Sequence, residues 1–179
     1  TLLGSAAGTS HAAAVGTRSS QVDSASTFSA GELAGTTVLS HGSLAVGREV
    51  RRIDVPNTPL IYSMVRAPDG SVFLGTGNEG RILRLRGDSV DEVAATGQLV
   101  VASLALDTDG TLYAGTLPEG RVFAIAAGGA MRELVQLPEA EHVWSLVVNG
   151  SSLLAGTGPN GRVYSIDRAG HAEVYYQSR

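Results

Sequence analysis

The sequence predicts an all-β protein built from repeated four-stranded sheets, and three observations support this fold class. A segment of about 40 residues occurs three times along the 179-residue chain. Glycine is abundant, with 23 residues against six prolines, which is typical of many tight turns rather than of long helices. No segment of comparable length shows helical periodicity.

The repeat is visible in three segments that begin at Ile61, Val101 and Val143. They read IYSMVRAPDGSVFLGTGNEGRILRL, VASLALDTDGTLYAGTLPEGRVFAI and VWSLVVNGSSLLAGTGPNGRVYSI. Each segment contains a turn glycine, a Gly-Thr pair and a Gly-Arg pair. The turn glycines are Gly70, Gly110 and Gly150, and the pairs begin at Gly75, Gly115 and Gly156 and at Gly80, Gly120 and Gly161. Because the turn glycines are 40 residues apart in both intervals, chance does not explain the pattern.

Turn residues divide the second repeat into four short strands. The stretch 100–106 is almost entirely apolar, as expected for an innermost strand that is covered on both faces. Further strands are expected at 111–116, 121–126 and 131–137, separated by DTDG, LPEG and GG turns. Four strands joined by three hairpins within 40 residues form one blade of a β-propeller.

The same division gives a layout for the whole chain. We expect three full blades at 59–97, 98–138 and 140–179, and a partial N-terminal blade at 27–58, where His41-Gly42 stands in the position of Asp69-Gly70. Residues 15–26 are rich in Ser, Gln and Asp and are expected to be a linker. Known propellers have about four to eight blades, so this ring is incomplete. We therefore expect a fragment that is completed by missing blades from the same gene, with closure by a homo-oligomer as the alternative.

Composition excludes several classes of function. The net charge is −4 and the arginines are scattered, so no basic surface for nucleic acid is expected. The chain has no cysteine, which excludes disulfides, thiolate zinc sites and cysteine nucleophiles. No stretch is long and apolar enough to insert into a bilayer as a helix.

The first 14 residues are small and apolar and end in the alanines 12–14. This composition is typical of the second half of a secretory signal peptide with its small-residue cleavage site. We therefore expect an exported protein, periplasmic or extracellular, with a flexible Ala/Gly/Ser tail as the alternative interpretation of 1–14.

The pattern Asp-Gly-x-x-x-x-Gly-Thr-x-x-x-Gly-Arg-Val resembles repeats of bacterial β-propeller proteins, namely the sensor-type propeller repeats and the NHL-like and lactonase-like propellers. The resemblance covers residues 59–179. It implies the fold more strongly than a function, because related propellers bind proteins, sugars, metals or small ligands and some are enzymes. The Trp-Asp dipeptide of eukaryotic WD repeats is absent, since Ser145 follows Trp144.

In a propeller, the loops that join blades and those that join second to third strands gather at one rim of the central channel. The weak ligand-binding candidates on the loops here are Asn78, Glu79, Glu119, Asn160, Glu141 and His142, accompanied by Asn57, Gln98 and Glu139. The resemblance to lactonase-like propellers implies that such oxygen-rich residues can hold calcium, which would polarise a lactone carbonyl. The alternative is that Asn, Glu and Gly stand there as good turn residues, and no metal ligand set is fixed by spacing.

One arginine recurs at the start of each expected third strand: Arg81, Arg121 and Arg162. A ring of guanidinium groups can grip an anionic ligand. A residue that repeats in every blade more often serves each blade in the same way, by pairing with a carboxylate or a loop carbonyl. The structural interpretation is therefore favoured for the arginines.

Two further positions of the inner strands are candidates for function: a serine that recurs in each repeat, and an aromatic residue that is present in two of them. Ser63, Ser103 and Ser145 lie outside any Gly-x-Ser-x-Gly elbow, so we expect no serine nucleophile and place these residues in the crowded channel lining. The equivalent positions Tyr62 and Trp144 are expected to be interblade core rather than a sugar-stacking platform. The histidines show no metal-ligand spacing.

The function expected from the sequence is a non-catalytic binding or sensing scaffold of an exported bacterial protein, which presents loops to a protein, carbohydrate or small ligand. No catalytic residue, bound metal or cofactor is assigned, with calcium as the one cofactor to test. The alternative function is a metal-dependent, lactonase-like hydrolytic propeller, which requires an acidic cluster near the channel axis.

Overall fold

A computed structural model describes residues 35–41, 43–47 and 51–178 of the chain. The expected export segment 1–14 and linker 15–26 lie outside these residues. The chain divides into two compact units, 1–52 and 53–179. In the first unit, β1 (Thr36–Val38) and β2 (Leu44–Val46) pair as an antiparallel hairpin, which lies within the range 27–58 expected for the partial blade.

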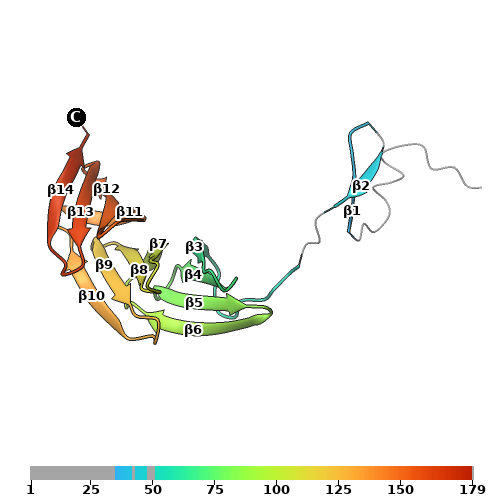
Figure 1. Ribbon diagram of the computed structural model, residues 1–179, viewed down its shortest axis with the longest axis horizontal. Coiled ribbons are helices and arrows are strands. Elements are labelled where there is room, and N and C mark those ends of the chain that lie inside the picture. The colour runs from blue at the N-terminus through green and yellow to red at the C-terminus, as the bar shows by residue number, and fades with distance from the viewer. Residues whose placement is uncertain (1–34, 42, 48–50, 179) are drawn as a thin grey trace, which may run out of the picture. The chain divides into compact units, whose positions relative to one another are not determined.

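The second unit consists of three four-stranded antiparallel sheets in chain order (Figure 1). The first sheet contains β3 (Ile61–Arg66), β4 (Val72–Thr76), β5 (Arg81–Arg86) and β6 (Ser89–Ala95). The second contains β7 (Val100–Leu106), β8 (Leu112–Leu117), β9 (Arg121–Ile125) and β10 (Met131–Gln136). The third contains β11 (Ala140–Asn149), β12 (Ser152–Pro159), β13 (Arg162–Asp167) and β14 (Ala172–Gln177).

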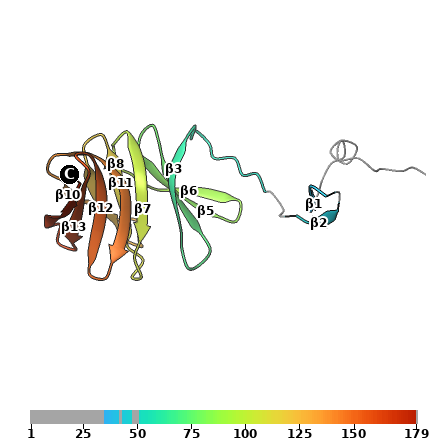
Figure 2. The ribbon, with the colours of Figure 1, turned by 90° about the horizontal axis from the view of Figure 1, so that it is seen from above.

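Each sheet is a meander in which every strand pairs with the next strand in the chain, as in a propeller blade. We call the sheets blades 1, 2 and 3. The innermost strands β3, β7 and β11 stand side by side, as Figure 2 shows. No strand of blade 1 pairs with a strand of blade 3 among the described residues, so the ring is open. The predicted all-β fold class, with an incomplete ring of four-stranded blades, is confirmed.

Every inner strand contains a β-bulge at the same place in the repeat. The register with the second strand shifts between Ile61 and Ser63, between Val101 and Ser103, and between Val143 and Ser145. The residue inside the bulge is Tyr62, Ala102 or Trp144. Because a bulge turns the side chains around it, Val101 and Val143 face the preceding blade, whereas Ser63 and Ser103 face the following one.

These inner-strand serines bind one blade to the next. Ser63 Oγ donates a hydrogen bond to the backbone carbonyl of Val101 at 3.0 Å, and Ser103 Oγ donates to that of Val143 at 3.0 Å. Both bonds run from one blade to its successor. The expectation that the serines line the channel is therefore corrected for Ser63 and Ser103, since their hydroxyls lie in the contact between blades.

The glycine of each Gly-Thr pair makes room for this contact. A Cβ atom on Gly115 would lie 2.5 Å from Val143 Cγ1 of the next blade and would also collide with Ser103 Oγ. A Cβ atom on Gly75 would lie 2.7 Å from Val101 Cγ1. Interiors are packed too densely to absorb such overlaps without a shift of backbone or side chains. The second strand therefore needs a residue without a side chain at this point.

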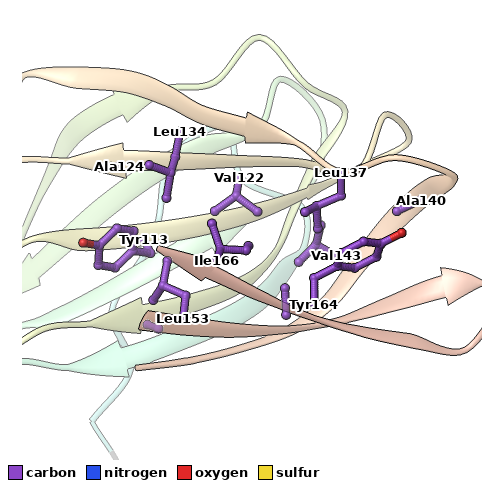
Figure 3. Packing of buried hydrophobic residues seen from close by; sticks show 12 residues of the cluster. Tyr113, Val122, Ala124, Leu134, Leu137, Ala140, Val143, Leu153, Tyr164 and Ile166 are labelled. Atoms are coloured by element: carbon purple, nitrogen blue, oxygen red, sulfur yellow. The ribbon is translucent and has the colours of Figure 1, made fainter. Parts of the chain in front are cut away.

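The hydrophobic core lies between blades rather than inside each one. One cluster joins blades 2 and 3, and Figure 3 shows its members, among them Tyr113, Val122, Leu153 and Ile166. A second cluster joins blades 1 and 2 around Ile82 and Val101. Since each cluster draws on two neighbouring blades, the stability of a blade depends on its neighbour, as in other repeat proteins.

A buried threonine closes the loop between the second and third strands of each blade. Thr76 Oγ1 and Thr116 Oγ1 each lie 3.1 Å from the carbonyl oxygen of the residue that starts the third strand, and Thr157 Oγ1 lies 3.0 Å from its equivalent. The carbonyl of the glycine before that residue accepts a backbone hydrogen bond from the end of the fourth strand, as in Leu137 N to Gly120 O at 3.0 Å. The repeated Thr and Gly residues therefore hold the rim loops in one shape.

The close approach at Gly115 predicts the effect of a single methyl group. Gly115→Ala should lower the free energy of unfolding by about 1–3 kcal/mol, because the new Cβ overlaps Val143 of the next blade. Gly128→Ala is the matched control, since a Cβ there meets nothing within 4 Å, and it should change stability by less than about 0.5 kcal/mol. Urea unfolding followed by circular dichroism measures both; equal effects would contradict the packing described here.

Candidate functional site

The rim between blades 2 and 3 contains a hollow of about 540 Å³. It is formed by the segment that leads from β10 into β11 and by the loop between β12 and β13. Its polar side chains are Gln136, Glu139, Glu141 and Asn160, and Pro138 and Pro159 contribute apolar surface. The candidate residues Glu141 and Asn160 are thus brought to one place, together with Glu139.

The loops around this hollow are fixed by short contacts. Tyr164 Oη donates a hydrogen bond to the carbonyl of Pro138 at 2.5 Å, and Asn160 Nδ2 donates to the carbonyl of Glu139 at 3.3 Å. The backbone N–H of Gly120 reaches the carbonyl of Glu141 in the next blade at 2.9 Å. The hollow is therefore shaped by contacts that the protein makes with itself.

Trp144 and His142 lie beside the hollow as a stacked pair. Their ring centroids are 5.0 Å apart with an interplanar angle of 26°. The indole lies against Gly158, where a Cβ atom would be 2.8 Å from Nε1, and Pro159 of the hollow follows Gly158 in the chain. Trp144 is 57% exposed. The site therefore combines a wide apolar ring face with neighbouring carboxylate and amide groups.

The prediction that Tyr62 and Trp144 fill the interblade core is wrong. Tyr62 is 51% exposed although blade 2 follows it, so the exposure of this position is not caused only by the open end of blade 3. The cause is the bulge, which turns the residue away from the contact between blades. The loop between the second and third strands has a glycine against each aromatic ring, Gly77 against Tyr62 and Gly158 against Trp144. In blade 2, where the bulged residue is Ala102, the loop has Leu117 at the same position.

The first rim loop does not join this site. Asn78 and Glu79 are both exposed and both adopt left-handed backbone conformations, with φ of 57° and 83°. Glu79 Oε2 lies 3.5 Å from Arg81 Nε. Asn57, which leads into blade 1, uses its backbone carbonyl to accept a hydrogen bond from Arg81 Nη2 at 2.5 Å. These residues form a separate cluster at the entrance to blade 1.

Glu119 is the centre of the second rim loop. Its Oε2 accepts a hydrogen bond from Gln98 Nε2 at 3.1 Å and lies 2.8 Å from Arg121 Nε. Arg121 also pairs with Glu133 at 2.7 Å. The hydrogen bond to Glu133 is the main cause that raises the pKa of Arg121, and the charge of Glu119 adds to it. Both carboxylates are therefore engaged with the protein's own arginine.

The three repeated arginines each connect the third strand to the segment that enters the same blade. Arg81 bonds the carbonyl of Asn57, and Arg162 pairs with Glu139 at 2.8 Å. Arg121 reaches the equivalent segment through Glu119 and Gln98. Hydrogen bonds to Tyr164 and then to Glu139 raise the pKa of Arg162. The geometry favours the structural interpretation of these arginines over a ring that grips an anion.

Sequence reasoning missed Arg168, which joins blades 2 and 3 at the end opposite the rim. Its guanidinium forms an ion pair with Asp107, donates to Tyr113 Oη at 2.5 Å and lies 5.3 Å above the Tyr113 ring. The equivalent positions in the other blades are Ala127 and Gly87. The sequence did offer one indication of this contact, because Arg168 is large and charged where the other two blades have small residues.

The described residues contain no group of three or more His, Asp or Glu side chains placed to hold a metal ion. His41 contacts Ser43, and His171 pairs with Asp167 at 2.8 Å. In the described part of the chain, no helix is of the length and apolarity that a membrane crossing needs.

Comparison with solved structures shows propellers as neighbours of this fold. Virginiamycin B lyase from Staphylococcus aureus is 16% identical with a TM-score of 0.62, and the match covers 78% of this chain and 47% of that one. A structure of the nidogen/laminin complex is 16% identical with a TM-score of 0.58, covering 65% and 48%. The calcium-binding protein regucalcin from Agrobacterium tumefaciens is 15% identical with a TM-score of 0.51, covering 62% and 42%.

The chain thus spans less than half of the length of these neighbours. At this level of identity the likeness shows the β-propeller fold alone. No model of a known protein family matches the sequence, and no curated protein matches it.

The exposure of Trp144 can be measured directly, because it is the only tryptophan in the chain. Its fluorescence should be quenched readily by acrylamide in the folded protein, because the side chain is 57% exposed. A blue-shifted emission that resists quenching would show that the ring is buried, and the candidate site would then lose its apolar face.

Proposed function

We propose that this chain is part of a non-catalytic propeller that binds a neutral carbohydrate at the rim between blades 2 and 3. The observation that carries this proposal is the half-exposed Trp144, stacked on His142 beside a polar hollow. A sugar ring has an apolar face of C–H groups and a periphery of hydroxyls. The indole offers surface to the former, and Glu139, Glu141 and Asn160 offer hydrogen-bonding groups to the latter.

The charges of the rim support a neutral ligand rather than an anionic one. The arginines that face the rim are paired with carboxylates, Arg162 with Glu139 among them, and Glu141 is a further exposed carboxylate at the hollow. Such a surface repels an anionic polymer and accepts a neutral one. Neutral oligosaccharides are therefore favoured over acidic glycans.

Some positions of the repeat are the same in every blade, whereas the bulged position differs between blades. The serine, glycine, threonine and arginine positions recur in every blade and carry contacts within and between blades. The bulged position varies between Tyr62, Ala102 and Trp144, and its aromatic members are exposed. Variation at an exposed position of a rigid repeat is typical of a ligand-binding surface.

An exported location fits this proposal, since the small, apolar residues 1–14 are typical of the end of a signal peptide. The solved structures that are similar to this chain include a lyase as well as a calcium-binding protein, so the fold also allows catalysis. The alternative for this chain, a calcium-dependent lactonase-like hydrolase, needs a set of metal ligands that the described residues do not bring together.

Binding to an array of neutral and acidic oligosaccharides tests the proposal. We expect the chain to bind neutral oligosaccharides, and Trp144→Ala to weaken the binding of the best one by about 10-fold or more, because truncating a central aromatic residue of a binding site typically costs about 2 kcal/mol or more. Tyr176→Ala is the matched control, since Tyr176 is equally exposed but lies on the outer strand β14.

Two results would contradict the proposal. If Trp144→Ala keeps the affinity of the unchanged chain, the ligand does not bind at this rim. If the bound oligosaccharide is cleaved, as mass spectrometry of the incubated sugar would reveal, the protein is an enzyme rather than a scaffold. Calorimetric titration provides the affinities.

A further inference from the structure

The contact between neighbouring blades encloses a hollow at the end opposite the rim, and this hollow occurs twice in the chain. Its volume is about 260 Å³ between blades 1 and 2 and about 620 Å³ between blades 2 and 3. Equivalent positions of the repeat line both hollows, so the two can be compared residue by residue. We call the larger one the basal hollow, and the residues that matter below are Asp109, Ala124, Ala126, Ala130 and Arg132.

In the smaller hollow, arginines of the chain itself neutralise the carboxylate. Arg84 Nη2 lies 2.7 Å from Asp69 Oδ2, and the Arg84 guanidinium lies 5.3 Å above the ring of Phe73. Arg86 Nη2 lies 3.6 Å from the same carboxylate oxygen. Hydrogen bonds from Ser71 and the charge of Arg84 lower the pKa of Asp69 to about 2. The charges of this hollow therefore meet one another.

Both of these arginines are replaced by alanine in the basal hollow. Ala124 stands in the register position of Arg84, and Ala126 stands in that of Arg86. Ala130 lies across the hairpin from Ala126, whose backbone N–H donates to the Ala130 carbonyl at 2.9 Å. The alanines form an apolar floor, and the volume lies within the range of about 300–1,000 Å³ that is usual for small-ligand sites.

Asp109 lies at one side of this floor without a cation of its own. Its Oδ1 accepts a hydrogen bond from the backbone N–H of Thr111 at 2.8 Å. Hydrogen bonds from Thr111 lower the pKa of Asp109, and the charge of Arg168 adds to this, so the carboxylate is ionised at neutral pH. Asp109 forms no ion pair within the part of the chain that the structure describes, whereas its equivalent Asp69 has two.

Arg168 is close enough to influence Asp109 but is fully engaged elsewhere. It forms an ion pair with the largely buried Asp107, and Nη1 also donates to Tyr113 Oη. Its Nε donates to the carbonyl of Ser151 at 3.1 Å, and its Nη2 donates to that of Gly150 at 3.0 Å. Arg168 therefore holds blades 2 and 3 together and leaves Asp109 to another partner.

Arg132 lies at the other side of the alanine floor. It stands opposite Ala124 in the register of β9 and β10, where blade 1 has Asp91 opposite Arg84. Its Nη2 donates to the carbonyl of Arg168 at 3.0 Å, and its other nitrogens have no partner among the described residues. Because β9 separates β8 from β10, the backbones of these two strands are about 10 Å apart. One negative and one positive group thus stand on opposite sides of an apolar floor.

We propose that the basal hollow binds an extended zwitterion, with an ammonium or guanidinium group on Asp109, a carboxylate on Arg132 and methylene groups over the alanines. This chemistry belongs to ω-amino acids and to a lysine or arginine that has a free α-carboxylate, whether as a free amino acid or at the end of a peptide. The site lies away from the rim and is independent of the carbohydrate site proposed there.

The charges of the basal hollow favour this class of ligand over a simple ion. Its four charged side chains are Asp107, Asp109, Arg132 and Arg168, and their charges sum to zero. A simple cation meets the repulsion of the arginines, and a simple anion meets that of the aspartates. A zwitterion pairs with both ends of the hollow, and a guanidinium group can hold a carboxylate through two parallel hydrogen bonds.

Nuclear magnetic resonance titration of the 179-residue chain with 6-aminohexanoate tests the proposal. We expect saturable shifts of backbone amide signals that centre on Ala124, Ala126, Ala130 and Arg132. Hexylamine and hexanoate carry one of the two charges each and should bind about 10-fold more weakly or worse, because each lacks one charged hydrogen-bond partner. A short peptide that ends in lysine shows whether the hollow also accepts the end of a chain or only a free amino acid.

Two variants remove the charged ends of the site. Asp109→Asn and Arg132→Gln should each weaken the binding of 6-aminohexanoate by about 10-fold or more, because a hydrogen bond to a charged group is lost. The asparagine can still accept the hydrogen bond from Thr111, which preserves the turn. Asp91→Asn is the matched control, since Asp91 is an exposed carboxylate of blade 1, and it should keep the affinity.

A third variant rebuilds the arrangement of blade 1 inside the basal hollow. Ala126→Arg places a guanidinium at the position of Arg86, within reach of Asp109, and should abolish binding of 6-aminohexanoate. Position 126 is exposed, so this variant keeps the test decisive if Asp109→Asn disturbs the turn. Trp144→Ala should leave the affinity for 6-aminohexanoate unchanged, which separates this site from the rim.

Four outcomes would overturn the proposal. An absence of saturable shifts with 6-aminohexanoate would show that the hollow binds no such zwitterion. Equal binding of hexylamine would remove any part for Arg132. Unchanged affinity in Asp109→Asn and Ala126→Arg would place the ligand elsewhere, and an equal loss in Asp91→Asn would show a general effect of charge.

Discussion

The hydrogen bond from an inner-strand serine to the carbonyl of the next blade is the contact on which the rest of this structure depends. It forms only because the strand beside it has a glycine, and it forms only because a bulge turns the serine toward the following blade. The serine, the glycine and the bulge therefore act together to form the contact between blades, and all three recur in each repeat. The apolar clusters on either side of β7 form around this contact.

The residue inside the bulge takes no part in this contact, so its identity can differ between blades. The side chain at that position packs on its own rim loop, against glycine when it is aromatic, and contributes little to the contact between blades. The residue at this position can therefore differ from blade to blade, as Tyr62, Ala102 and Trp144 do, without a change in the contact between blades. The pairing of arginines with rim carboxylates serves the opposite purpose, because it fixes the loops and removes positive charge from the rim.

The fold was predictable from the sequence because its signals are local and repeated. Turn glycines at a constant spacing, and an apolar inner strand before each of them, identify four-stranded blades without knowledge of how the blades meet. The contact between blades was not predictable, because a bulge changes which side a residue faces without changing the composition of the strand. For that reason Ser103 was expected in the channel lining and Trp144 in the core, and each lies elsewhere.

The candidate site was predictable in part. The rim position of Glu141 and Asn160 follows from blade topology, and the structure brings these two residues to one hollow with Glu139. The partners of Glu119 and Arg162 depend on side-chain reach across loops, which spacing alone does not define. Arg168 contacts Tyr113 and Asp107 of a different blade, 55 and 61 positions away, and no local pattern indicates such a contact.

The most direct test of the central claim compares two serines that are equivalent in sequence and differ in their surroundings. The free energy of unfolding is measured for Ser103→Ala and for Ser145→Ala, the second of which changes an exposed hydroxyl without a hydrogen-bond partner among the described residues. Ser103→Ala should lose about 1 kcal/mol, because the hydroxyl bonds Val143 in the next blade, and Ser145→Ala should lose almost nothing. Equal losses, or no loss at Ser103, would contradict the claim that this hydrogen bond holds the blades together.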